Sequence, residues 1–137
     1  MKQVQIVAPE YIHQVWGEVE ALLNQAFVDY DKPDYDVAHL KVLIIEQLQY
    51  LFVVTEDSKI IGAFTVEIMN RPNHRIAHTT AMGGKDVFSG DTVEQYEGWA
   101  RLQGVTKIRA YAQDAQARLF KQKLGLEKVT TVVEKLL

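Results

Sequence analysis

The chain has 137 residues, of which 47 % are apolar and 24 % are charged, and its net charge is −3. This length and composition predict one compact domain over residues 1–137 and exclude a disordered chain. The slightly acidic balance argues against nucleic acid or an anionic membrane as a partner. The sequence contains no cysteine, which excludes disulfides, thiolate metal sites and a cysteine nucleophile. No apolar run is long enough for a signal peptide or a membrane helix, so we expect a cytoplasmic protein.

The first third of the chain predicts one strand followed by two helices. Residues 4–7 alternate apolar and polar side chains, a pattern typical of a strand. Residues 11–27 place their apolar side chains on one helical face. After the polar segment 29–36, Asp36 is the expected N-cap of a second helix, which we expect to end near Gln49.

The middle of the chain predicts three strands. Residues 51–55 and 60–69 are rich in β-formers and flank the polar turn 56–59, which predicts a hairpin. Residues 75–82 predict a third strand of this meander. Strict alternation along that strand puts His78 and Met82 on one face of the sheet.

The last third predicts two further helices and two further strands. Asp91 is the expected start of a third helix that Gly104 ends, and a strand follows over residues 107–112. A fourth helix closes at Gly125, and the β-branched residues 126–133 predict a final strand. The resulting order, β-α-α-β-β-β-α-β-α-β, predicts an α/β (α+β) fold with a mixed central sheet and helices on both faces.

Three local patterns make this order similar to the GNAT acetyltransferase superfamily. Residues 56–63 (EDSKIIGA) resemble the family's hairpin, and residues 98–108 (GWARLQGVTKI) resemble its third helix and fifth strand. Residues 117–126 (ARLFKQKLGL) resemble its fourth helix with the closing Leu-Gly step. The likeness extends to the small GNAT-like proteins that bacteriophages encode, in which a Gly-Gly dipeptide ends the fourth strand. It implies acetyl-CoA as cofactor and a small-molecule or protein amine as acceptor, and a phage origin implies the host cytoplasm or the virion.

The resemblance places the acetyl-CoA contacts at the end of the fourth strand and in the loop that follows. There the family presents backbone N–H groups and a helix N-terminus to the pyrophosphate. Residues 84–90 (GKDVFSG) depart from the family pattern of Arg or Gln, two residues, Gly, one residue, and Gly or Ala. Val87 and Phe88 stand where backbone has to approach a phosphate. The residues left to bind the cofactor are Met82, Gly83, Gly84, Lys85, Ser89 and Gly90. The alternative is a plain strand–helix connection whose glycines serve turn geometry.

The resemblance also directs attention to three candidate catalytic residues. The family's tyrosine on the fourth helix is replaced by Lys121, so Tyr111 on the preceding strand is either the substitute proton donor or a packed aromatic. Glu67 and His78 lie on central strands and are candidate bases for the amine; a solvated Glu and a core histidine are the structural alternatives. The acidic and aromatic residues 27–35 lie where the family places its acceptor loop, or else form a solvated linker. The histidines show no metal-ligand spacing, so no metal is expected.

Two functions of different classes remain open from the sequence. One is a GNAT-like N-acetyltransferase whose degenerate motifs leave it weak or inactive. The other is a catalytically inactive GNAT-fold protein that binds another protein, as a phage virion component or an inhibitor of a host factor. The enzyme predicts an open V between the fourth and fifth strands, and the binding protein predicts a cleft filled by Met82, Phe88 or Tyr111. The β-branched last strand and exposed sheet edges also allow copies of the chain to associate.

Overall fold

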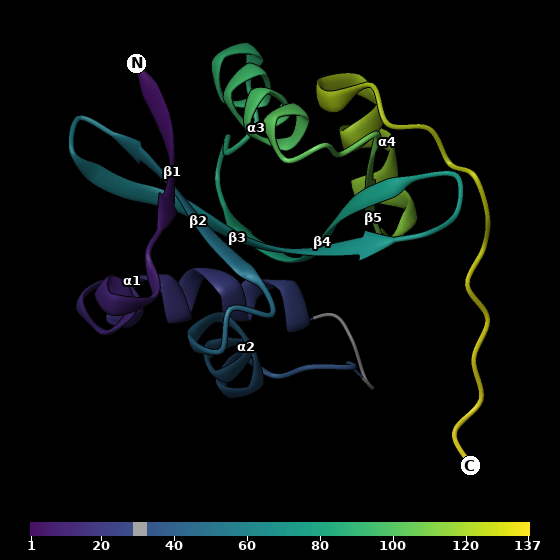
Figure 1. Cartoon of the computed structure of the whole chain (residues 1–137), viewed down its shortest axis with the longest axis horizontal. Coiled ribbons are helices and arrows are strands. Elements are labelled where there is room, and N and C mark those ends of the chain that lie inside the picture. The colour runs from purple at the N-terminus through teal and green to yellow at the C-terminus, as the bar shows by residue number, and fades with distance from the viewer. Residues whose placement is uncertain (29–32) are drawn as a thin grey trace.

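A computed structural model describes residues 1–28 and 33–137 of the chain. Five strands form one sheet in the order β1-β2-β3-β4-β5, in which β5 is parallel to β4 and the other neighbours are antiparallel. Figure 1 shows α1 and α2 on one face of the sheet and α3 and α4 on the other. The predicted mixed α/β sheet with helices on both faces is therefore confirmed. The elements are β1 (Lys2–Val7), α1 (Ile12–Asn24), α2 (Val37–Ile45), β2 (Tyr50–Glu56), β3 (Lys59–Asn70), β4 (Arg75–Gly84), α3 (Gly90–Leu102), β5 (Lys107–Ala110) and α4 (Asp114–Leu124), with 3₁₀ turns at Pro9–Tyr11 and Gln25–Phe27.

The helices on the α1–α2 face begin as the sequence predicts, but α2 ends early. The Asp36 carboxylate accepts the His39 N–H at 2.9 Å, and the His39 ring accepts the Asp36 N–H at 3.2 Å, so the predicted N-cap is present. The predicted end near Gln49 is wrong, because α2 stops at Ile45 and Gln47 adopts a positive φ of 62° that turns the chain out of the helix. None of the described helices has the length and apolar character that a membrane crossing requires.

The sheet separates two apolar clusters because side chains alternate along each strand. On β2, Leu51 and Val53 pack against α1 and α2, whereas Phe52 and Val54 pack beneath α3. The burial of consecutive residues on this strand follows from helices covering both faces.

A β-bulge on β4 interrupts this alternation and decides which residues face each layer. Thr65 pairs with Ala81 while Val66 pairs with Thr79, so Thr80 is the extra residue. Beyond the bulge, Met82 lies on the α3 face with Thr79. The predicted sharing of one face by His78 and Met82 is therefore wrong, because strict alternation does not hold across an inserted residue.

The connections around α3 and α4 also differ in part from the prediction. The N-cap of α3 is Ser89, whose N–H donates to Thr92 Oγ1 at 2.8 Å, and not Asp91. The strand β5 ends at Ala110, two residues earlier than expected. Gly125 closes α4 with a positive φ of 70°, as its position predicts.

The predicted final strand over residues 126–133 is wrong for the isolated chain. Residues 125–137 form no strand and run as an extended arm away from the sheet, shown in yellow in Figure 1. The physical reason is that β-branched residues favour extended backbone, but a strand also needs a neighbour for its ladder hydrogen bonds. None of the described strands pairs with the arm.

Candidate functional site

The three predicted catalytic residues come together on the α1–α2 face of the sheet. Glu67 on β3 and His78 on β4 are direct cross-strand partners, so their side chains lie side by side on this face. The ring of His78 meets that of Tyr111 edge-on, with 4.6 Å between the centroids. His78 is buried, Glu67 is half-buried and Tyr111 is exposed, so the group connects the sheet to solvent. We call Glu67, His78, Tyr111 and the nearby Tyr35 the polar cluster.

A chain of hydrogen bonds anchors the bulge beside this cluster. Thr80 Oγ1 lies 2.6 Å from Gln49 Oε1 and 2.6 Å from Thr65 Oγ1. Because the amide oxygen only accepts, Thr80 donates to Gln49, and the Thr65 hydroxyl then donates to Thr80. Gln49 is 3 % exposed, and its Nε2 has no hydrogen-bond partner among the described residues. Burial raises the pKa of Tyr35 and the Glu67 charge raises it further, although the Gln49 side chain partly opposes this.

The environment shifts the pKa values of the two candidate bases in opposite directions. Burial raises the pKa of Glu67, and the charge of Arg71 only partly opposes this, so the carboxylate is a stronger base than usual. Burial lowers the pKa of His78, and the charge of Arg109 lowers it further. Its imidazole is therefore neutral at neutral pH. The buried Nδ1 of His78 has no hydrogen-bond partner among the described residues.

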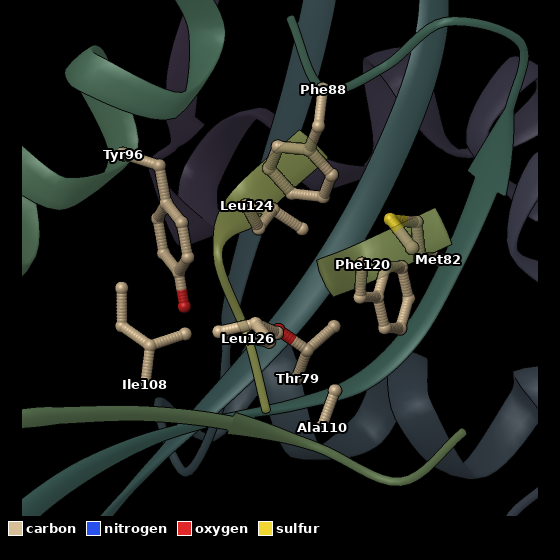
Figure 2. Close-up of a pocket in the computed structure, with 9 residues that line it drawn as sticks. All are labelled: Thr79, Met82, Phe88, Tyr96, Ile108, Ala110, Phe120, Leu124 and Leu126. Atoms are coloured by element: carbon tan, nitrogen blue, oxygen red, sulfur yellow. The ribbon is translucent and has the colours of Figure 1, made fainter. Parts of the chain in front are cut away.

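On the opposite face, apolar side chains fill the space beyond the last β4–β5 pair, where the V is expected. The two strands pair only between residues 76–79 and 107–110, and β4 continues to Gly84. The open V that the enzyme predicts is therefore filled. Within the V, the cavity in Figure 2 measures only about 10 Å³, roughly the space of one water molecule. Phe88 is 7 % exposed, and its ring centroid lies 5.2 Å from that of Phe64. The cavity is lined by Thr79, Met82, Phe88, Tyr96, Ile108, Ala110, Phe120, Leu124 and Leu126. Of the three predicted cleft-filling residues, Met82 and Phe88 therefore line it and Tyr111 does not.

The sequence did not single out Tyr96, whose hydroxyl points into this cavity (Figure 2). The oxygen is buried and has no hydrogen-bond partner among the described residues. Burial, partly opposed by Thr79, raises the pKa of Tyr96 to about 12, so the hydroxyl stays protonated and can donate. On the sequence, Tyr96 is one of the inward positions of an amphipathic helix. The sequence feature that could have drawn attention to Tyr96 is a tyrosine at a buried position, because its hydroxyl usually needs a hydrogen-bond partner.

Gly83 and Gly84 have packing roles in this structure. A Cβ on Gly83 would lie 1.6 Å from the carbonyl oxygen of Leu22, so β4 approaches the end of α1 too closely for any side chain. Gly84 has a φ of +115° and donates its N–H to Gln25 Oε1 at 3.0 Å. Both glycines therefore have a structural reason to be glycine without a cofactor.

The remaining predicted cofactor residues are not brought to one place. Met82 lines the small cavity, whereas Lys85 lines a separate open hollow of about 480 Å³ between α1, the β2–β3 hairpin and residues 84–86. The N–H of Ser89 is already bonded to Thr92 Oγ1 at the start of α3. Gly90 follows it with open space around its Cα.

Whole-chain comparison with solved structures identifies the fold. An aminoglycoside acetyltransferase from an uncultured soil metagenomic sample, solved with trehalose, is 14 % identical, with a TM-score of 0.70 and coverage of 98 % of this chain and 96 % of that chain. A predicted acetyltransferase with acetyl-CoA from Clostridium acetobutylicum is 14 % identical, with a TM-score of 0.66 and coverage of 99 % and 96 %. A ribosomal-protein-alanine N-acetyltransferase from Brucella melitensis biovar Abortus is 10 % identical, with a TM-score of 0.67 and coverage of 100 % and 98 %. The protein has the GNAT acetyltransferase fold. No family model matches the chain, and no curated protein sequence matches it.

The GNAT fold implies acetyl-CoA in the V between β4 and β5, and the side chains there do not fit it as they stand. A cavity of about 10 Å³ has no room for the pantetheine arm of the cofactor. The strand geometry is suitable, since β4 beyond Thr79 has no described strand on that side. The cofactor therefore fits only when side chains that line this cavity move.

Proposed function

We propose that the protein is a GNAT-type N-acetyltransferase that transfers the acetyl group of acetyl-CoA to an amine bound at the polar cluster. One observation carries this proposal. The polar cluster and the cavity between β4 and β5 lie on opposite faces of the same short segment of β4, with His78 on one face and Thr79 on the other. In a transferase the donor and acceptor have to meet, which here requires the cofactor to reach past the last β4–β5 pair, Thr79 with Ala110.

On the acceptor side, Glu67 is the group that removes a proton from the amine. An amine reaches the protein as an ammonium ion, which a half-buried carboxylate attracts and deprotonates, leaving the neutral amine and a protonated Glu67. His78 lies beside it as a neutral imidazole and adds no positive charge that would repel the ammonium ion. Asp34, whose charge also acts on Tyr35, supplies a second negative charge on this side of the sheet.

The test on the donor side is calorimetric titration with acetyl-CoA and with CoA. We expect weak binding by the natural chain and at least tenfold tighter binding by Phe88→Ala, because removal of the ring enlarges the cavity. Val87→Ala is the matched control, since Val87 is buried in the same connection but does not line the cavity; its affinity should equal that of the natural chain. The proposal is overturned when none of the three proteins binds at millimolar cofactor.

The test on the acceptor side measures the free thiol of CoA, which forms when acetyl-CoA loses its acetyl group. The chain has no cysteine, so the protein itself gives no background in a thiol assay. Sisomicin, which is bound in one of the similar structures, and a peptide with an N-terminal alanine represent two acceptor classes. Glu67→Gln should lower the rate of acetyl transfer about 10²-fold without changing the affinity for the cofactor. An unchanged rate would show that Glu67 is not the base.

A second candidate function is binding of another protein without catalysis. The filled cleft favours it, because Phe88 and Met82 occupy the place of the donor and Gly83 and Gly84 serve packing. The same titration separates the two functions. If acetyl-CoA does not bind even to Phe88→Ala, the result supports the non-catalytic function. If it binds to the natural chain as well as to the variant, the non-catalytic function is rejected.

A further inference from the structure

The two edges of the sheet differ in whether their outer backbone groups have hydrogen-bond partners. At the β1 edge, the side-chain amide of Gln95 on α3 accepts the Val4 N–H at 2.8 Å and donates to the Lys2 carbonyl at 3.0 Å. One side chain thus satisfies the backbone as a neighbouring strand would, and it blocks pairing with another chain. The β5 edge has no such cover: β5 pairs with β4 on one side and with no described strand on the other.

The arm of residues 126–137 has the composition of a strand but no neighbour. Its centre, residues 129–133 (VTTVV), is uncharged and β-branched, and Glu-Lys pairs flank it on both sides. Val129 is 83 % exposed and Val133 is 87 % exposed. An apolar, β-branched segment left in water is stabilised by pairing with a free strand edge.

The position of the arm connects these two features. Leu126 lines the cavity together with Ile108 and Ala110 of β5, so the arm begins next to the bare edge. It then leaves the body of its own chain, as Figure 1 shows. Twelve residues in extended form reach about 40 Å, enough to cross to a second molecule. The uncharged centre of the arm and β5 are also similar in length, at residues 129–133 and 107–110.

We propose that the arm adds as a strand to the free edge of β5 in a second copy of this chain, in a reciprocal exchange. The departing arm and the bare edge are complementary features of one molecule, so two copies related by a twofold axis satisfy both arms and both edges. The exchange closes on itself at two copies, because each arm and each β5 edge is used once. It also places the partner's arm beside Ile108 and Arg109, at the margin of the cavity and of the polar cluster.

The oligomeric state of the full chain tests this proposal. Light scattering after size exclusion should give twice the chain mass of 15.6 kDa. Thr131→Pro removes an N–H and fixes φ in the centre of the arm, so it should give a monomer, whereas the matched control Thr131→Val should stay dimeric. Both changes lie in an exposed segment, so neither should affect folding. A monomeric natural chain, a dimeric Thr131→Pro variant or open-ended oligomers would each overturn the exchange.

Hydrogen exchange identifies the recipient edge. In the dimer, amides of residues 107–110 should exchange at least tenfold more slowly than in Thr131→Pro, while amides of β2 should be equal in the two proteins. Equal exchange at residues 107–110 in a dimer and a monomer would show that the arm pairs elsewhere, and would overturn β5 as its site. Neither measurement involves acetyl-CoA, so the outcome is independent of the catalytic proposal.

Discussion

Replacing Phe88 with alanine tests the account of the filled cleft most directly. The ring is 7 % exposed and packs against Phe64 and Tyr96, with centroids 5.2 Å and 6.2 Å away. Phe→Ala at such a site costs about 3–5 kcal/mol; the ring borders an existing cavity that can relax, so we expect the lower value, about 3 kcal/mol. With an unfolding entropy of about 2.1 cal/mol/K per residue, this loss lowers Tm by about 10 °C in a chain of this length.

The assay is urea denaturation followed by tryptophan fluorescence. Trp99 reports on the same aromatic cluster, because its ring meets that of Phe52 edge-on at 4.8 Å. Val87→Ala, which removes two buried carbons from the same connection, should cost about 1.5–2 kcal/mol. A loss under 1 kcal/mol for Phe88→Ala would show that the ring does not pack in the cleft. If Phe88→Ala loses about 3 kcal/mol of stability but its affinity for acetyl-CoA is unchanged, the ring packs in the cleft as described but acetyl-CoA does not bind in the V.

Three further predictions concern β4, α2 and the polar cluster. Gly83→Ala should destabilise the fold by more than 3 kcal/mol, because its Cβ would meet the Leu22 carbonyl oxygen, whereas Gly90→Ala, with open space around it, should change the free energy of unfolding by less than about 1 kcal/mol in the same urea assay. Asp36→Ala removes the N-cap of α2 and should cost about 1 kcal/mol, seen as a lower urea midpoint; an unchanged midpoint would contradict the cap. Burial lowers the pKa of His78 below 6.5, so the unfolded chain binds this proton more readily and stability falls as the pH drops below about 6.5. In His78→Phe the loss between pH 6.5 and 5 should be smaller, and an identical pH profile would show that His78 does not titrate in this range.

Local sequence signals predicted the elements that local physics decides. The hairpin of β2 and β3 follows from two β-rich runs around a polar turn, and Gly125 ends α4 because it adopts the left-handed conformation. Asp36 caps α2 through atoms three residues away. Each of these interactions lies within a few residues of chain, so one sequence window contains both partners.

The candidate site was predicted only in part. Glu67, His78 and Tyr111 were found separately, from strand position and side-chain chemistry, and the structure places them together. Gln49 was missed because its role depends on α2 ending early and on Thr80, 31 residues away. Tyr96 was missed because an aromatic on the inner face of a helix has the same sequence pattern whether or not its hydroxyl faces a cavity.

The layers of this protein can be derived from its sequence, since the apolar periods of helices and strands and the turn residues between them specify a mixed sheet covered on both faces. Which side chains meet depends on the tertiary structure. One inserted residue at Thr80 moved Met82 to the α3 face, where it and Phe88 fill the V between β4 and β5. The final strand also depended on tertiary structure, because β-branched residues can form a strand only when a second strand supplies their hydrogen bonds. Contacts between distant segments are set by packing and register, and no short stretch of sequence contains that information.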